Sequence, residues 1–209
     1  MEIGIETSPK LRVGLPHNMQ GPTLDDLSKT YNVEKQSVSD FLDVIAYLES
    51  KRENIKQEGG GPGSGYYQLE TGSSEGGYTR LEQIARDLPK ELTPSWAWPA
   101  VKAARKNDRS FDASMLNRDQ QNYLMASYIL LYDRGAIENF QNAESWGEQK
   151  DIVLNYWVDR HWAGYGDNES LREEQKAKGS YDLNVYKRNK DWASDMLAPE
   201  FNIDNMYYG

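Results

Sequence analysis

The sequence predicts a mainly helical α+β domain in which a small extended element follows one of the helices. Apolar residues recur at three- and four-residue steps in several segments, which is the helical period. A single glycine-rich block, residues 59–65, interrupts this pattern. The 209 residues suit one domain with a sizeable core, predicted over residues 24–196, without internal repeats.

The two ends of the chain predict arms rather than further domains. Residues 1–23 contain prolines and few periodic apolar residues, and residues 197–209 keep aromatic residues without periodicity. Segments of this kind commonly pack on their own domain or on a neighbouring subunit. We therefore expect an N-terminal arm and a C-terminal arm.

Residues 23–36 predict a short helix and a turn, and residues 37–50 predict a longer helix. Ser37 or Ser39 is the expected cap of the longer helix. Its apolar stripe consists of Val38, Phe41, Leu42, Val44, Ile45 and Leu48.

Glu49 directly follows the last residue of this stripe, so it lies at the edge of the buried face. Partial burial raises the pKa of a carboxyl group, and a carboxyl that is protonated near neutral pH can donate a proton to a glycosidic oxygen. The alternative interpretation is a solvated residue at the end of a helix, as most surface glutamates are.

The glycine block cannot continue a helix, and glycine allows the backbone to approach a ligand closely. We expect the next five residues to be extended, with Tyr67 and Leu69 on one face and Tyr66, Gln68 and Glu70 on the other. Tyrosine rings suit sugar faces, and a glutamine amide can bond hydroxyl and acetamido groups. The alternative for the glycines is a flexible linker.

Residues 79–92 predict a helix that Pro89 stops. Trp96 and Trp98 lie in a proline-bounded segment, where they are either core residues or platforms for sugar stacking. The charged run 171–179 is typical of a solvated helical face.

Two capping patterns predict the helices of the second half. Asn117 and Gln120 form a capping pair for a helix expected to end at Gly135. Ser145 and Glu148 form a capping box at the start of the next helix.

Composition excludes several classes of function. The chain has no cysteine, and its two histidines, His17 and His161, form no metal-ligand pattern, so we expect no metal and no cofactor. The formal charge of −9 argues against nucleic acid as a partner. No stretch is apolar enough to span a membrane, and the first residues do not form a signal peptide.

The pattern ES…GGGPGSGYYQLE, within residues 49–70, resembles the active-site segment of the lysozyme-like lytic transglycosylases of tailed bacteriophages. Residues 116–135 and 151–166 are also similar to segments of that family, so the resemblance covers roughly residues 40–170. His161–Trp162 stands where the family usually has a Tyr-Asn pair.

The resemblance implies a lysozyme-like fold in which Glu49 is the general acid and base. Ser50 matches the serine beside the acid, Gly65 and Tyr66 match the turn, and Gln68 matches the glutamine that lines the saccharide groove. The residues expected to contact the glycan strand are Ser50, Gly65, Tyr66, Tyr67, Gln68, Glu70, His161 and Trp162.

The implied reaction cuts the β-1,4 bond between N-acetylmuramic acid and N-acetylglucosamine in peptidoglycan. A lytic transglycosylase needs one carboxylate, because the C6 hydroxyl of the muramic acid closes a 1,6-anhydro ring. A hydrolytic lysozyme uses a second carboxylate, for which Glu58 and Glu70 are the available residues. The sequence leaves both outcomes open.

The resemblance also implies a location. A phage protein of this kind is made in the host cytoplasm, is carried in the virion and acts on the host cell envelope during genome ejection. Bacterial walls are usually anionic, so a charge of −9 favours delivery by the particle over free diffusion. We expect other virion proteins as partners and a homo-oligomer in the particle. The alternatives are a structural virion protein with little activity and a free endolysin.

Overall fold

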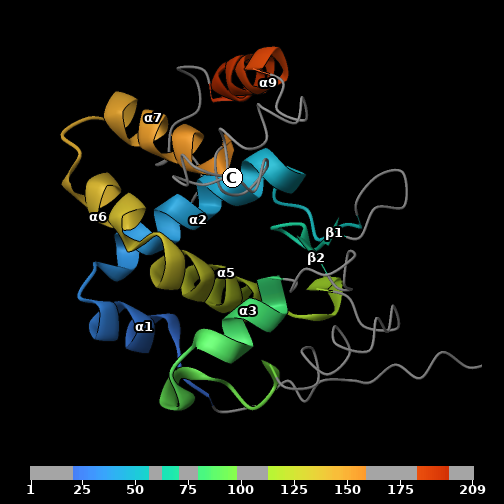
Figure 1. Cartoon of the computed structure of the whole chain (residues 1–209), viewed down its shortest axis with the longest axis vertical. Coiled ribbons are helices and arrows are strands. Elements are labelled where there is room, and N and C mark those ends of the chain that lie inside the picture. The colour runs from blue at the N-terminus through green and yellow to red at the C-terminus, as the bar shows by residue number, and fades with distance from the viewer. Residues whose placement is uncertain (1–20, 57–62, 71–79, 98–112, 159–182, 198–209) are drawn as a thin grey trace, which may run out of the picture.

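The computed structural model describes residues 21–56, 63–70, 80–97, 113–158 and 183–197, and these are mainly helical, as predicted (Figure 1). The helices are α1 (Leu24–Tyr31), α2 (Lys35–Ser50), α3 (Arg80–Asp87), α5 (Arg118–Tyr132), α6 (Arg134–Asn142), α7 (Trp146–Tyr156) and α9 (Leu183–Met196), with 3-10 turns η2 (Lys90–Leu92) and η3 (Ala113–Met115). The strands are β1 (Gly63–Ser64) and β2 (Leu69–Glu70).

Helix α2 runs through the middle of the molecule, with α5 and α7 beside it (Figure 1). The whole predicted apolar stripe of α2 is buried. Phe41 packs edge-to-face on Phe140 of α6 and on Tyr156 of α7, with ring centroids 5.4 and 5.3 Å apart. The core therefore fixes α2 on several sides and positions its C-terminal turn.

The start of α2 differs from the expectation. The helix begins at Lys35, before both serines that were expected as its cap, Ser37 and Ser39, and Glu34 occupies the N-cap without a side-chain cap bond. Ser37 lies inside the first turn, where its hydroxyl reaches the Glu34 carboxylate at 3.4 Å. The prediction of a serine cap was wrong because a helix can begin without one when its apolar face is buried.

The β element is a two-stranded antiparallel hairpin, with Ser64 opposite Leu69. The prediction of a continuous extended run over residues 66–70 was wrong, because residues 65–68 form the turn of the hairpin. Gly65 and Gln68 adopt positive φ angles of 80° and 47°, which bend the chain back on itself. Tyr67 and Leu69, which were expected to share one face, are both buried.

The capping pair of α5 is confirmed: Asn117 and Gln120 each accept a hydrogen bond from the other's backbone N–H. The predicted end of this helix was wrong. Asp133 leaves helical geometry after Tyr132, and Gly135 lies inside the next helix, α6. The Ser145 hydroxyl caps α7 as predicted, but the Glu148 carboxylate bonds the backbone N–H of Glu144 instead of that of Ser145.

Trp96 is a core residue, because it is buried and packs edge-to-face on Tyr123 at 6.2 Å. Trp98 and the run 171–179 lie outside the described residues, as do almost all residues of the two predicted arms.

Helix α9 was not predicted, because the segment is rich in charged residues. Ala193 and Leu197 are buried. The Lys150 ammonium of α7 donates to the Ser194 carbonyl at 2.9 Å, and Lys190 donates to the Asn155 side chain at 2.6 Å. These contacts place α9 against α7.

Candidate functional site

The C-terminal turn of α2 carries Glu49 and Ser50, and an unusual backbone follows it. Lys51 and Arg52 both have positive φ angles, 54° and 63°. Their N–H groups cap the helix by donating to the Tyr47 and Ala46 carbonyls at 3.0 and 3.1 Å. Two consecutive non-glycine residues in this region store strain of roughly 1–3 kcal/mol each, and such strain clusters at functional sites.

The Glu49 carboxylate contacts the indole of Trp157, the residue that caps the C-terminus of α7. The Trp157 ring N–H donates to Glu49 Oε1 at 2.6 Å. Trp157 is itself buried, and Glu49 is half-buried. The indole N–H fixes the direction of the carboxylate, and its apolar ring reduces the carboxylate's contact with water.

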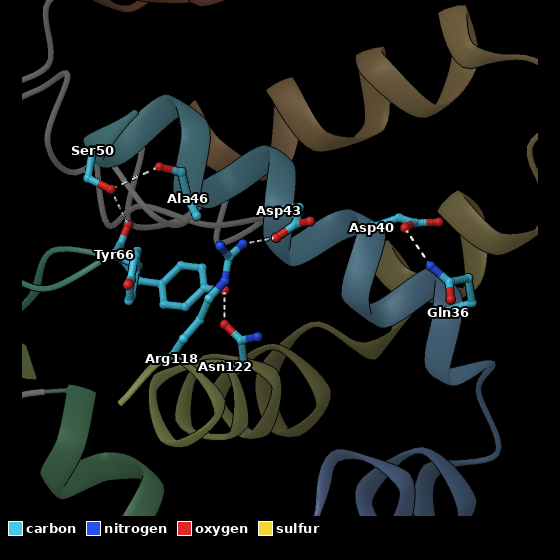
Figure 2. Close-up of polar contacts among 9 residues, drawn as sticks. Gln36, Asp40, Asp43, Ala46, Ser50, Tyr66, Arg118 and Asn122 are labelled. Atoms are coloured by element: carbon cyan, nitrogen blue, oxygen red, sulfur yellow. Dashed lines mark hydrogen bonds and ion pairs between the residues drawn. The ribbon is translucent and has the colours of Figure 1, made fainter. Parts of the chain in front are cut away.

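Ser50 ties α2 to the hairpin (Figure 2). Its buried hydroxyl lies 2.9 Å from the Tyr66 carbonyl oxygen and 3.0 Å from the Ala46 carbonyl oxygen. The neighbouring chain also pairs with β1, because Lys56 bridges Ser64 and the Gly65 N–H donates to the Ile55 carbonyl at 2.7 Å. The hairpin turn is therefore attached to the C-terminal turn of α2, which also carries Glu49.

Gln121 of α5 holds the other side of the turn. Its fully buried amide accepts from the Tyr66 N–H at 2.8 Å and donates to the Leu116 carbonyl and the Asn54 side chain at 2.9 and 3.0 Å. The amide oxygen lies so close to Gly65 that a Cβ there would stand 2.1 Å from it. Gly65 is thus required both by its φ of 80° and by this close approach.

The aromatic residues of the turn have internal partners. The Tyr67 ring is fully buried and its hydroxyl donates to the Asn122 side chain at 2.6 Å, so Tyr67 attaches the turn to α5. Burial raises the pKa of Tyr67, which keeps this hydroxyl neutral. Tyr66 is half-buried and lies under the Arg118 guanidinium at 5.3 Å, and Arg118 pairs with Asp43 (Figure 2).

Gln68 keeps one amide atom unused. Its Nε2 donates to the Gly65 carbonyl at 2.8 Å, which braces the turn. Its Oε1 is buried and has no hydrogen-bond partner within the part of the chain that the structure describes. A buried acceptor without a partner calls for an explanation, and a ligand N–H or O–H is one.

The remaining predicted site residues are less fully placed. Glu70 pairs with Gly63 in the hairpin backbone. His161, Trp162 and Glu58 lie outside the described residues. Among the residues that the structure describes, no group of three or more acidic or histidine side chains is placed to hold a metal ion.

Sequence reasoning assigned no role to Gln121 or to Trp157. Gln121 had one local signal, because it is a polar residue three and four positions before the buried Leu124 and Met125. Trp157 had none, because its contact with Glu49 joins residues 108 positions apart.

Replacing Gln121 with Leu is expected to destabilise the protein by about 2–4 kcal/mol, because the Tyr66 N–H and the Leu116 carbonyl lose their buried partner. Chemical denaturation measures this loss. The matched control is Gln120→Leu at the neighbouring cap, which is expected to cost only about 1 kcal/mol. Equal costs for the two variants would contradict the role of Gln121 as the support of the turn.

Comparison with known proteins adds no relative: protein-family models, curated proteins and solved structures gave no match to this chain. Within the described segments, every helix is too short or too polar to cross a bilayer.

Proposed function

We propose that this chain is a peptidoglycan-cleaving enzyme of the lytic transglycosylase or lysozyme type, with a lysozyme-like fold, carried in the virion of a tailed bacteriophage. The observation that carries the proposal is the hydrogen bond from the Trp157 ring N–H to the Glu49 carboxylate, in the last turn of a core helix. The next residue, Ser50, bonds the Tyr66 carbonyl and so anchors the hairpin turn to that helix. A carboxyl at a helix end beside a short antiparallel hairpin supports both the fold and the role of the acid.

In this proposal Glu49 acts twice. Its protonated carboxyl donates a proton to the glycosidic oxygen as the bond from C1 of the muramic acid breaks. The resulting carboxylate then takes the proton of the C6 hydroxyl as that oxygen attacks C1. The proton count closes without water, and Glu49 returns to its starting form. The unpartnered Gln68 Oε1 is available to accept from an acetamido N–H or a hydroxyl of the strand.

The direct test of activity is the release of soluble fragments from labelled, purified peptidoglycan. We expect the full-length wild-type protein to release label, and heat-denatured protein to release none. If the native folded protein releases no label over a range of pH, the enzymatic proposal is wrong and the structural alternative replaces it.

A structural virion protein built on the same fold is the second candidate. The specific observation in its favour is that the Glu49 carboxylate already accepts a hydrogen bond from the protein's own Trp157 ring N–H. Ser50 and Tyr67 also favour this candidate, because their hydroxyl groups bond other parts of the protein and thereby stabilise the fold without a substrate.

The indole bond gives a prediction of its own. Trp157→Phe is expected to lower the rate of cleavage about tenfold, because the carboxylate loses the donor that directs it. The readout is the rate of label release, with the melting temperature as the check on the fold.

Trp146→Phe, at the opposite end of α7, is the control for this variant and is expected to leave the rate of cleavage unchanged. If the two variants slow cleavage equally, Trp157 is a packing residue and does not position the acid.

The proposed location is tested separately. We expect the protein in gradient-purified virions, in several symmetry-related copies, because closed rings are the usual way in which identical subunits bury terminal arms. Quantitative proteomics of particles and lysate measures this distribution. Abundance in the lysate together with absence from particles would identify a free endolysin instead.

A further inference from the structure

Trp192 of α9 is half exposed, although it lies one contact away from the candidate acid. Its ring centroid is 6.2 Å from that of Trp157, whose N–H holds Glu49, and 50% of Trp192 remains accessible to solvent. Large aromatic side chains are usually buried more completely than this. The structure thus leaves an open indole beside the end of α2.

Lys51 places a positive charge next to this indole. Its ammonium lies 4.7 Å from the Tyr47 ring centroid, 5.8 Å from the Trp192 ring centroid and 3.3 Å from the Met196 sulfur. Within the residues that the structure describes, the Lys51 ammonium contacts aromatic rings and a thioether and forms no ion pair. A chain with a formal charge of −9 therefore presents, two residues after Glu49, a cation that has no acidic partner among the described residues.

The backbone helps to set this geometry. Lys51 is the left-handed residue that ends α2, so its side chain leaves the helix at a fixed point beside Tyr47. Because α9 is held on α7 by Lys150 and Lys190, Trp192 is fixed relative to the same point. The indole and the ammonium are thus positioned by packing that does not depend on a ligand.

We propose that Trp192 and Lys51 form a binding subsite for a carboxylate-bearing amino sugar of the glycan strand. This inference rests on the proposed function, because it places the sugar next to Glu49. The open indole stacks on the pyranose ring, and the ammonium pairs with the sugar's carboxylate, as found on the lactyl group of a muramic acid that carries no stem peptide. The subsite selects the carboxylated sugar over its neutral neighbour.

Binding is measured by calorimetry in the Glu49→Gln background, so that the ligand stays intact. The probes are a soluble tetrasaccharide of alternating N-acetylglucosamine and N-acetylmuramic acid, and a chitin tetrasaccharide that lacks carboxylates. Trp192→Ala is expected to weaken both probes by about 3- to 10-fold, and Trp192→Phe is expected to restore most of this loss. Lys51→Gln is expected to weaken only the carboxylated probe, by about threefold or more.

Lys35→Gln, at the other end of α2, is the control and is expected to bind both probes as the parent does. Unchanged affinity in Trp192→Ala, with an unchanged melting temperature, would overturn the subsite. Equal losses of both probes in Lys51→Gln would overturn the assignment of the carboxylate.

The two proposals fail separately. If the subsite variants behave as expected but the wild-type protein never cleaves peptidoglycan, the subsite stands and the enzymatic function falls. If the wild-type protein cleaves but Trp192→Ala binds normally, only the subsite falls.

Discussion

Glu49→Gln is expected to lower the rate of peptidoglycan cleavage by about 10²–10⁴-fold while the protein stays folded. The amide is nearly the same size as the carboxyl, and its oxygen can still accept the hydrogen bond from the Trp157 ring N–H. The amide cannot donate the proton that the leaving oxygen requires. Only the chemistry is therefore removed, and the packing around the end of α2 is kept.

Label release from purified peptidoglycan measures the rate, and the melting temperature checks the fold. The matched control is Glu53→Gln, an exposed acid four residues further along, which is expected to keep full activity. Full activity in Glu49→Gln would eliminate Glu49 as the acid. Equal losses in both variants would show that the effect comes from a change in surface charge.

Gly65→Val is expected to destabilise the protein by roughly 3–5 kcal/mol and to impair substrate binding. The φ of 80° is unfavourable for a branched side chain, and the new Cβ would stand 2.1 Å from the Gln121 amide oxygen. The Gln121 side chain has to move, which also breaks its bond to the Tyr66 N–H. The turn beside Glu49 would then lose its support from α5.

Gly135→Val is the matched control, because a Cβ at Gly135 meets nothing within 4 Å. This control is expected to change stability by less than about 1 kcal/mol. Denaturation curves of both variants compare the two glycines. If Gly65→Val leaves stability and cleavage unchanged, the glycine block is only a linker.

Several helices were predictable because the spacing of apolar residues along a helix determines which of its faces is buried. The stripe of α2 lies in the core as predicted, and Asn117 caps α5 as predicted. Helix boundaries were less predictable. The end of α5 depends on Asp133 leaving helical geometry, and Gly135 did not mark it. Helix α9 was missed because a run of polar and charged residues, 187–191, interrupts its apolar pattern, and polar contacts such as that from Lys150 to Ser194 help to hold it.

The hairpin was predictable in part. The glycine-rich pattern indicated that a side chain would not be tolerated at Gly65. The positive φ of this residue and its close contact with the Gln121 amide both exclude a Cβ. The positive φ of Gln68 had no signal, because glutamine rarely adopts it, and that angle turns the expected strand into a turn.

The partners of the site residues were the least predictable part. Tyr66 meets Gln121 across 55 positions, and Glu49 meets Trp157 across 108 positions. Such contacts follow from how the helices assemble around α2, and a local pattern in one segment carries no information about them. The candidate acid and its turn could be found in the sequence, whereas the groups that hold them required the fold.

Mass spectrometry of the muropeptides released by the wild-type protein, beside those released by Glu49→Gln, tests the central claim most directly. We expect the wild-type protein to release 1,6-anhydro-muropeptides, as one carboxylate acting as acid and then base predicts, and the variant to release almost none. Products with reducing ends would assign a lysozyme with a second catalytic group. No products from the wild-type protein, or equal products from both proteins, would contradict the role of Glu49.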